Sequence, residues 1–261
     1  MTSSKKIKSY WDEQAKTHGK NLAATMPDYY LKKLEIENIK SCLDDDRYIV
    51  DIGCGNGYSL FEIAEKLPNS VFLGLDYSEE MIKQANKTLD EDFAHLKDRV
   101  KFEVSDITNL SLKKKADIII TNRCLINLYS EKDQVKAISN ISKSLTAGGK
   151  YVMCEDFKDS LDNLNKLRQK MSLEPITTRW HNLYLNTQKI VESTSKWLNL
   201  QKEIRFSSLY YLNSRVIYAK MCQDNSETPD YLHPINEATY KLSSSVEVGD
   251  IGPLKLLVWQ K

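Results

Sequence analysis

A carboxylate followed by three alternating glycines is the clearest indication of chemistry in this chain. Residues 50–57 read Val-Asp-Ile-Gly-Cys-Gly-Asn-Gly, so that Asp51 precedes Gly53, Gly55 and Gly57. Glycine allows the backbone to approach a ligand that side chains would block. A carboxylate beside this turn repels a pyrophosphate but accepts hydrogen bonds from a cationic or amino-bearing ligand. The spacing also differs from the dinucleotide pattern G-x-G-x-x-G, which disfavours a nicotinamide site.

Further polar residues stand where other apolar runs end. Asp76 ends the second run, and its carboxylate can accept two hydroxyl groups of a ribose. The alternative is that Asp76 caps the following helix, although Ser78 is better placed for that role. Arg123 follows the fourth run, where a guanidinium can hold a carboxylate or a phosphate with two hydrogen bonds. The alternative for Arg123 is an ion pair with an acid such as Glu155 or Asp51.

The elements that must position these residues alternate between strand and helix. Apolar runs between helical patterns predict a mostly parallel sheet covered on both faces, with all its carboxyl ends at one edge. We therefore expect an α/β fold with a Rossmann-like, doubly wound sheet of seven strands and an antiparallel last strand. The expected strands are Tyr48–Ile52, Val71–Asp76, Val100–Val104, Ala116–Asn122, Lys150–Glu155, Glu203–Leu212 and Leu254–Trp259.

The remaining segments predict a cap over the carboxyl edge of the sheet. We expect residues 1–261 to form a single domain, with cap elements from 1–30, 156–187 and 213–253. The last of these segments is too long for a simple hairpin loop and is expected to contain helices.

Composition describes an ordinary globular protein. The formal net charge is +1, and no basic stripe with interleaved aromatic residues appears, so nucleic acid is a poor candidate partner. No apolar run is long enough to span a bilayer and no signal peptide is evident, so we expect a cytoplasmic protein and no membrane partner. The five cysteines are widely spaced without a CxxC pair, which disfavours disulfides and zinc. No cluster of carboxylates indicates a metal site.

The run 50–57 resembles motif I of the class I S-adenosylmethionine-dependent methyltransferases. Four further elements follow in the order expected for that family, at the ends of later strands. The resemblance implies S-adenosylmethionine as the cofactor, with Asp51 near its methionine amino group, Asp76 on its ribose and Asp106 on its adenine amino group. The cofactor residues that it implies are Asp51, Gly53, Cys54, Gly55, Asp76, Tyr77, Asp106, Ile107 and Asn122.

Methyl transfer from a sulfonium needs positioning of the acceptor and exclusion of water, with a general base when the acceptor is a hydroxyl. The candidate bases are His181, His233 and Glu155. We favour His181 because Arg179, Trp180 and Tyr184 accompany it in one predicted active-site loop. The predicted catalytic residues are thus His181, Arg123 and Glu155.

The acceptor is predicted to be a small polar or anionic metabolite. No Asn-Pro-Pro-Tyr run follows the fourth strand, which disfavours methylation of DNA bases. Runs at 123–128, 180–185 and 249–259 resemble bacterial methyltransferases found among surface-polysaccharide genes. This resemblance implies a sugar-, phosphate- or phosphoramidate-bearing precursor as acceptor, and the protein is expected to act as a monomer or homodimer. The alternatives are a nucleotide-binding oxidoreductase and a non-catalytic partner protein that only binds S-adenosylmethionine.

Overall fold

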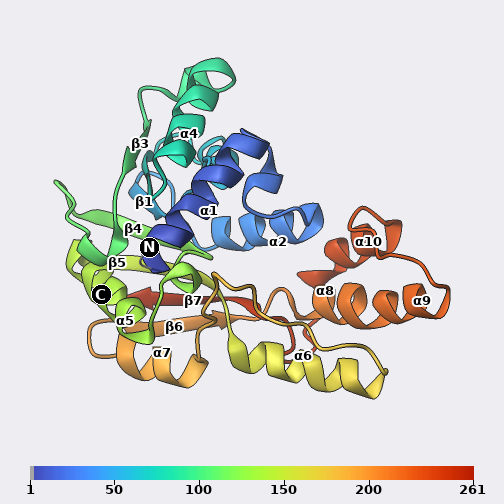
Figure 1. Ribbon diagram of the computed structural model, residues 1–261. Coiled ribbons are helices and arrows are strands. Elements are labelled where there is room, and N and C mark those ends of the chain that lie inside the picture. The colour runs from blue at the N-terminus through green and yellow to red at the C-terminus, as the bar shows by residue number, and fades with distance from the viewer. Residues whose placement is uncertain (1–2) are drawn as a thin grey trace.

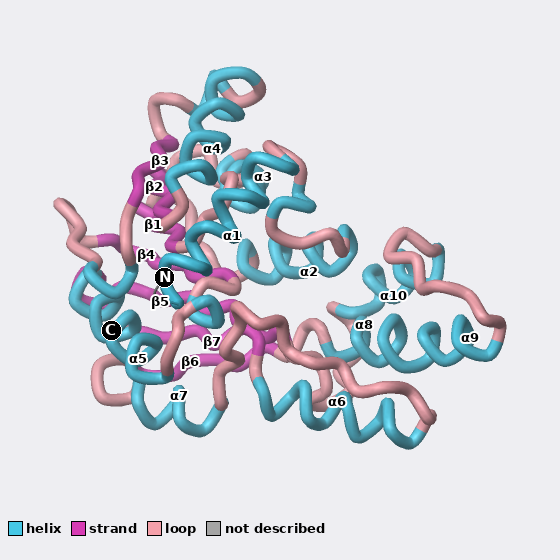
Figure 2. Tube along the Cα trace, in the orientation of Figure 1, coloured by secondary structure: helices cyan, strands magenta, loops and turns pink. Residues whose placement is uncertain are grey.

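A seven-stranded sheet organises the protein. The computed structural model describes residues 3–261, and its strands lie in the order β3-β2-β1-β4-β5-β7-β6 (Figures 1 and 2). Their bounds are β1 Tyr48–Ile52, β2 Val71–Asp76, β3 Val100–Val104, β4 Ala116–Asn122, β5 Leu145–Asp156, β6 Asn199–Ile204 and β7 Leu254–Gln260. The strands β1 to β5 pair in parallel, and β7 runs antiparallel to both β5 and β6. The predicted Rossmann-like fold is therefore confirmed.

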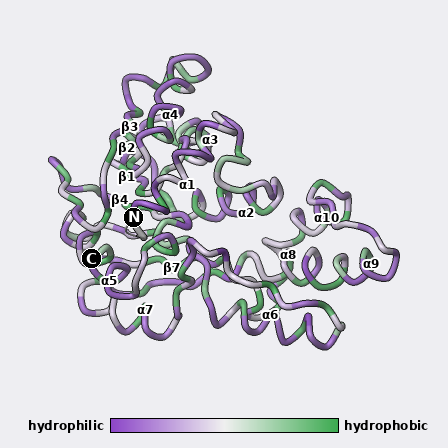
Figure 3. Tube along the Cα trace, in the orientation of Figure 1, coloured by the Kyte–Doolittle hydropathy of each residue, from purple (hydrophilic) through white to green (hydrophobic). Residues whose placement is uncertain are grey.

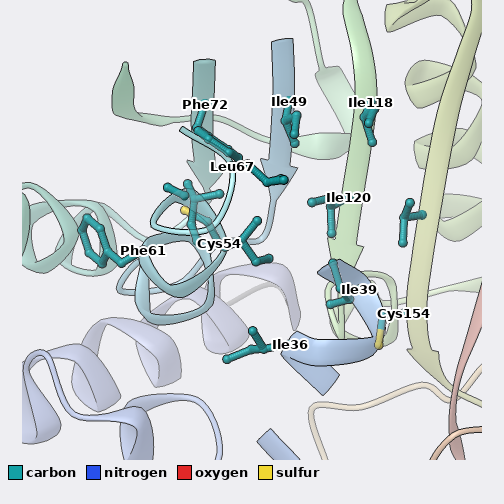
Figure 4. Close-up of a cluster of buried hydrophobic side chains, with 14 of the residues drawn as sticks. Ile36, Ile39, Ile49, Cys54, Phe61, Leu67, Phe72, Ile118, Ile120 and Cys154 are labelled. Atoms are coloured by element: carbon teal, nitrogen blue, oxygen red, sulfur yellow. The ribbon is translucent and has the colours of Figure 1, made fainter. Parts of the chain in front are cut away.

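Side chains alternate along each strand, so the two faces of the sheet contribute to two separate hydrophobic cores. On one face, Ile49, Ile118, Ile120 and Cys154 pack with helices α2 and α3 (Figure 4), and on the other, Val50 and Ile119 pack with helix α5. Hydrophobic residues, green in Figure 3, are accordingly frequent in the central strands. The α-helices are α1 Ser3–His18, α2 Tyr29–Lys40, α3 Tyr58–Ala64, α4 Glu79–Glu91, α5 Glu131–Ser144, α6 Lys158–Lys170, α7 Thr187–Thr194, α8 Ser208–Leu212, α9 Tyr218–Asp224 and α10 Pro234–Ser243.

One strand prediction is wrong in its position. The predicted strand Glu203–Leu212 is divided between the end of β6 and helix α8. The tyrosine-rich part forms the helix because Phe206 and Tyr210 pack into the core beside α2, whereas β6 begins earlier, at Asn199. The connection from α8 to β7 contains a π-helical turn at Asn213–Ile217 followed by α9 and α10, as expected of a helical insertion.

The insertion and helix α6 extend to one side of the sheet, at the right of Figure 1, while α1 crosses above the carboxyl edge. Within residues 3–261, none of the helices combines the length and the apolar character needed to cross a lipid bilayer.

Candidate functional site

A cavity of about 500 Å³ opens at the carboxyl edge of the sheet. Its wall combines the loops after β1, β2, β3 and β4 with side chains from the three predicted cap segments. Segment 1–30 supplies Trp11 and Met26, segment 156–187 supplies Arg179 and His181, and segment 213–253 supplies Arg215. These distant parts of the sequence thus meet at one site.

The glycine turn after β1 is fixed by the neighbouring strand and by the loop after β4. The backbone N–H groups of Gly53 and Cys54 both donate to the Leu75 carbonyl, at 2.7 and 3.0 Å. Gly53 has a φ of +78°, and a Cβ at this position would lie 2.6 Å from the Cβ of Cys124. Glycine is therefore required at 53 by the adjacent loop as well as by its backbone conformation.

Asp76 is placed on the cavity wall, and its carboxylate is already oriented by backbone. It accepts hydrogen bonds from the N–H groups of Gly55 at 2.9 Å and Ser78 at 2.8 Å. Ser78, not Asp76, caps helix α4, because its hydroxyl accepts the Met81 N–H at 3.1 Å. Burial raises the pKa of Asp76, which is the direction expected for a carboxylate without a cation beside it.

Asp51 is buried, and its Oδ1 atom has no hydrogen-bond partner. Asp51 does not itself line the cavity, but its neighbours Ile52 and Gly53 do. Burial raises the pKa of Asp51 to about 7, against the attraction of the nearby Lys32 ammonium. Lys32 is itself buried and donates to Glu35 Oε1 at 2.5 Å. The site therefore holds an unsatisfied acceptor at the start of the glycine turn.

Arg123 forms its ion pair with an acid that sequence analysis did not identify. Its Nε lies 3.2 Å from Glu35 Oε2, in ion-pair contact but outside hydrogen-bond geometry, and neither predicted partner, Glu155 or Asp51, is the one used. Arg123 also donates to the Met26 sulfur at 3.2 Å and adopts a φ of +50°. Arg123 lines the cavity, but its guanidinium already contacts Glu35 and Met26.

Asn122 lies between the cavity and the same acid. Its Nδ2 donates to Glu35 Oε1, which leaves the buried Oδ1 atom without a partner. Asn122 therefore holds a second buried acceptor without a partner, at the end of the strand that pairs with β1, which carries Asp51.

Glu155 and Cys54, two of the predicted site residues, do not lie on the cavity wall. Glu155 is buried and accepts the N–H groups of Cys124, Leu125 and Ile126 at 3.0 to 3.3 Å, so both its oxygens hold the loop after β4. Cys54 lies in the core beside α3 (Figure 4), and its N–H is engaged by β2. Neither side chain is available to a ligand.

The far end of the cavity is formed by the residues predicted to hold an adenine ring. Asp106, Ile107 and Tyr77 all line it, and Tyr77 is 40% exposed. Asp106 uses Oδ1 to accept the N–H and hydroxyl of Thr108, each at 2.8 Å.

His181 is buried within an aromatic group and lines the cavity. Its ring stacks on Tyr10 with centroids 4.4 Å apart and meets Trp11 and Trp180 edge-on. Burial, helped by the Arg179 charge, lowers the pKa of His181 to about 4, so the imidazole is neutral at neutral pH. Its Nδ1 atom is buried and has no hydrogen-bond partner among residues 3–261.

Two acidic residues on the cavity wall, Asp156 and Asp28, were not singled out in the sequence, whereas Arg215 was expected to favour an anionic acceptor. Asp156, at the end of β5, is 5% exposed and lines the cavity. Arg215 also lines it, and is paired with Asp28, which in turn accepts the Tyr210 hydroxyl at 2.7 Å. Only the contact between segments far apart in sequence could have identified this wall, since each residue taken alone resembles an ordinary surface charge.

Comparison with known proteins gives a consistent result. A family model described as a methyltransferase domain matches residues 43–239. The chain is 32% identical over 116 residues to trans-aconitate 2-methyltransferase of Acidovorax sp. (strain JS42), covering 44% of this chain and 40% of that protein. It is 31% identical over 134 residues to carboxy-S-adenosyl-L-methionine synthase of Nautilia profundicola (strain ATCC BAA-1463 / DSM 18972 / AmH), covering 51% and 55%. The alignments thus span about half or less of these relatives.

A solved structure extends the likeness to nearly the whole chain. The TehB-like SAM-dependent methyltransferase from Corynebacterium glutamicum ATCC 13032 Kitasato superposes with a TM-score of 0.58. The sequence identity is 15%, and the match covers 96% of this chain and 97% of that one. At this identity the likeness establishes the shared fold.

Proposed function

The chain belongs to the methyltransferase domain family, and from this premise we propose that it transfers a methyl group from S-adenosylmethionine to a small polar or anionic metabolite. The observation that carries the proposal is the cavity itself. One end carries carboxylates that follow the strands, and the other end is lined by charged and aromatic cap residues.

The residues at the first end fit the cofactor. Asp51, whose neighbours Ile52 and Gly53 line the cavity, is the acid we propose for the ammonium of its methionine part, and Asp76 suits the two ribose hydroxyls. Tyr77, Asp106 and Ile107 would hold the adenine, while Gly53 and Gly55 keep the wall thin enough for close approach. When bound, the cofactor supplies an already activated methyl group on a sulfonium.

The cap segments 1–30, 156–187 and 213–253 are proposed to form the acceptor side. Of its arginines, Arg215 and Arg123 are already paired with acids, whereas Arg179 makes no ion pair among the described residues. Arg179 is therefore our candidate for holding an anionic group of the acceptor. The relative named for trans-aconitate gives a precedent for a small anionic acceptor.

His181, Arg123 and Glu155 take different roles in this proposal. His181 offers a neutral imidazole that can accept a hydrogen bond from the acceptor. Arg123 shapes the wall between the two ends, and Glu155 acts as a positioning residue that holds the loop carrying Arg123. Within this class, we propose a sugar-, phosphate- or phosphoramidate-bearing precursor of surface polysaccharide as the acceptor.

Titration calorimetry followed by a methyl-transfer screen tests the proposal. S-adenosylmethionine should bind, and NAD should not. Mass spectrometry should then detect a mass gain of one methylene in a pool of small metabolites that includes phosphate-bearing sugars, with tRNA in a parallel reaction. Absence of S-adenosylmethionine binding would refute the proposal, and methylation of tRNA alone would refute the small acceptor.

A further inference from the structure

Asp156 is the last residue of β5 and points its carboxylate toward the acceptor end of the cavity. Val152 and Cys154 lie on the same side of the strand and pack in the core with helix α2. Asp156 lies on that side too, beyond the part that the helix covers, and it lines the cavity. The residue is 5% exposed, and its side chain accepts no hydrogen bond from any of residues 3–261. The neighbouring Glu155 points to the other face and is satisfied by three backbone N–H groups.

The charges around Asp156 are already paired with other acids. Arg123, whose charge acts on Asp156, is in contact with Glu35, and Arg215 is paired with Asp28. The phenols of Tyr184 and Tyr211 lie within the influence of this carboxylate: the Asp156 charge raises the pKa of Tyr184, and burial together with that charge raises the pKa of Tyr211. Asp156 is therefore a buried carboxylate without a hydrogen-bonded partner among residues 3–261, and a ligand in the cavity can supply one.

We infer that Asp156 binds the O–H or N–H group that is to be methylated and accepts its proton during the transfer. The inference rests on the proposed function, because it assumes that a methyl acceptor occupies this end of the cavity. The acceptor oxygen or nitrogen forms a bond to the methyl carbon while the carbon–sulfur bond breaks. The electron pair of the broken bond stays on sulfur, and the acceptor's proton passes to the Asp156 carboxylate.

The ionisation of Asp156 suits this role better than that of His181. Burial raises the pKa of Asp156 to about 6, where Arg123 acts to lower it and Glu35 to raise it. The carboxylate is thus charged at neutral pH and still close enough to neutrality to take a proton. The pKa of His181, about 4, makes its imidazole a much weaker proton acceptor.

The arrangement also narrows the acceptor class. Asp156 requires a hydrogen-bond donor at the reacting atom, either a hydroxyl or an amino group. Arg179, at the mouth, favours an anionic group elsewhere in the same molecule. The class is therefore an anionic hydroxy or amino compound, with the reacting group at the Asp156 end.

A pair of cofactor analogues tests this inference without the acceptor. Sinefungin carries an ammonium where the transferable methyl would lie, and S-adenosylhomocysteine carries nothing there. Calorimetric dissociation constants for both should be measured at pH 5 and pH 8. In the wild-type protein, the preference for sinefungin should increase about tenfold between these pH values, because the Asp156 carboxylate becomes charged. The ratio of the two dissociation constants is unaffected by titration of Asp51, because Asp51 is proposed to contact the methionine part that both ligands share.

The variant Asp156→Asn should lose the pH-dependent preference and bind sinefungin about tenfold more weakly at pH 8, with S-adenosylhomocysteine affinity within twofold of wild type. Asp156→Ser is a second uncharged variant, and Asp156→Glu should keep the preference. Asp162→Asn, an exposed change on helix α6, is the matched control and should behave as wild type.

Equal effects of Asp156→Asn on both ligands, or an unchanged preference for sinefungin, would overturn the role of Asp156 alone. Failure of both ligands to bind the wild-type protein would overturn the proposed function, and this inference with it.

Discussion

Replacing Asp51 by asparagine should make the cofactor-free protein more stable while weakening cofactor binding. Asp51 is buried with an unpaired oxygen, and burial raises its pKa from an ordinary value of 3.8 to about 7. A carboxyl group whose folded pKa is raised contributes stability that is fully present below the unfolded pKa and is lost as pH rises through the folded pKa. The ionised Asp51 is therefore a destabilising group above pH 7.

The magnitude follows from the two pKa values. The shift from 3.8 to about 7 corresponds to roughly 4 kcal/mol of lost stability when Asp51 is fully ionised. At pH 5 the loss is roughly 1.5 kcal/mol, because Asp51 is still mostly protonated in the folded protein. The stability advantage of Asp51→Asn over wild type should therefore grow by about 2.5 kcal/mol between pH 5 and pH 8.

Urea unfolding at pH 5, 6, 7 and 8 measures this difference directly, without and with saturating S-adenosylhomocysteine. Asp98→Asn makes the same chemical substitution at an exposed position, and it should change the free energy of unfolding by no more than about 0.5 kcal/mol at every pH. With the ligand present, wild type should gain more stability than Asp51→Asn, because the ligand's ammonium pairs with the Asp51 carboxylate. A stability difference that does not change with pH would refute the assignment of Asp51 as a buried, unpaired carboxylate.

Three further predictions concern the two ends of the cavity. Asp76→Ala should weaken cofactor affinity by about 1 to 3 kcal/mol in calorimetry, because it strands hydrogen-bonding groups, and an unchanged affinity would contradict the ribose role. His181→Ala should lower turnover with a cofactor affinity within twofold of wild type; a wild-type rate at saturating substrate would remove His181 from the acceptor site. Gly53→Ala should cost about 2 to 4 kcal/mol in urea unfolding, because its Cβ would overlap Cys124. Gly249→Ala, with a φ of +85° and open space around it, is the control and should cost only about 1 kcal/mol.

The sheet could be predicted because its strands carry their own signal. Each central strand is a short and mostly apolar run, and burial on both faces of the sheet requires that pattern. The segment Glu203–Leu212 was mispredicted because aromatic residues favour strands locally, whereas here Phe206 and Tyr210 are placed by packing against α2. Tertiary contact decided the outcome, and no local pattern contains it.

The acidic pair at the end of β5 shows a second limit of prediction from the sequence. Glu155 and Asp156 are adjacent, so they point to opposite faces, and the sequence does not say which face holds the cavity. Sequence analysis chose Glu155, but the structure uses it to hold the loop after β4 and places Asp156 in the cavity. The choice depends on which face the cap covers, and that follows only from the assembled chain.

Strand parity also explains why helix α2 buries two charges. Asp51, Asn122 and Asp156 lie on the face of the sheet that packs against α2, since Ile49, Ile120 and Cys154 precede them by two residues and belong to that core. Polar groups that are kept unpaired for a ligand would leave this face with uncompensated charge. Lys32 and Glu35 are one helical turn apart on α2 and lie against these groups, where Lys32 attracts Asp51 and Glu35 pairs with Arg123. The helix thus answers the strand-end charges one by one, because Lys32 attracts Asp51 and Glu35 pairs with Arg123, while the Glu35 charge acts against ionisation of Asp156.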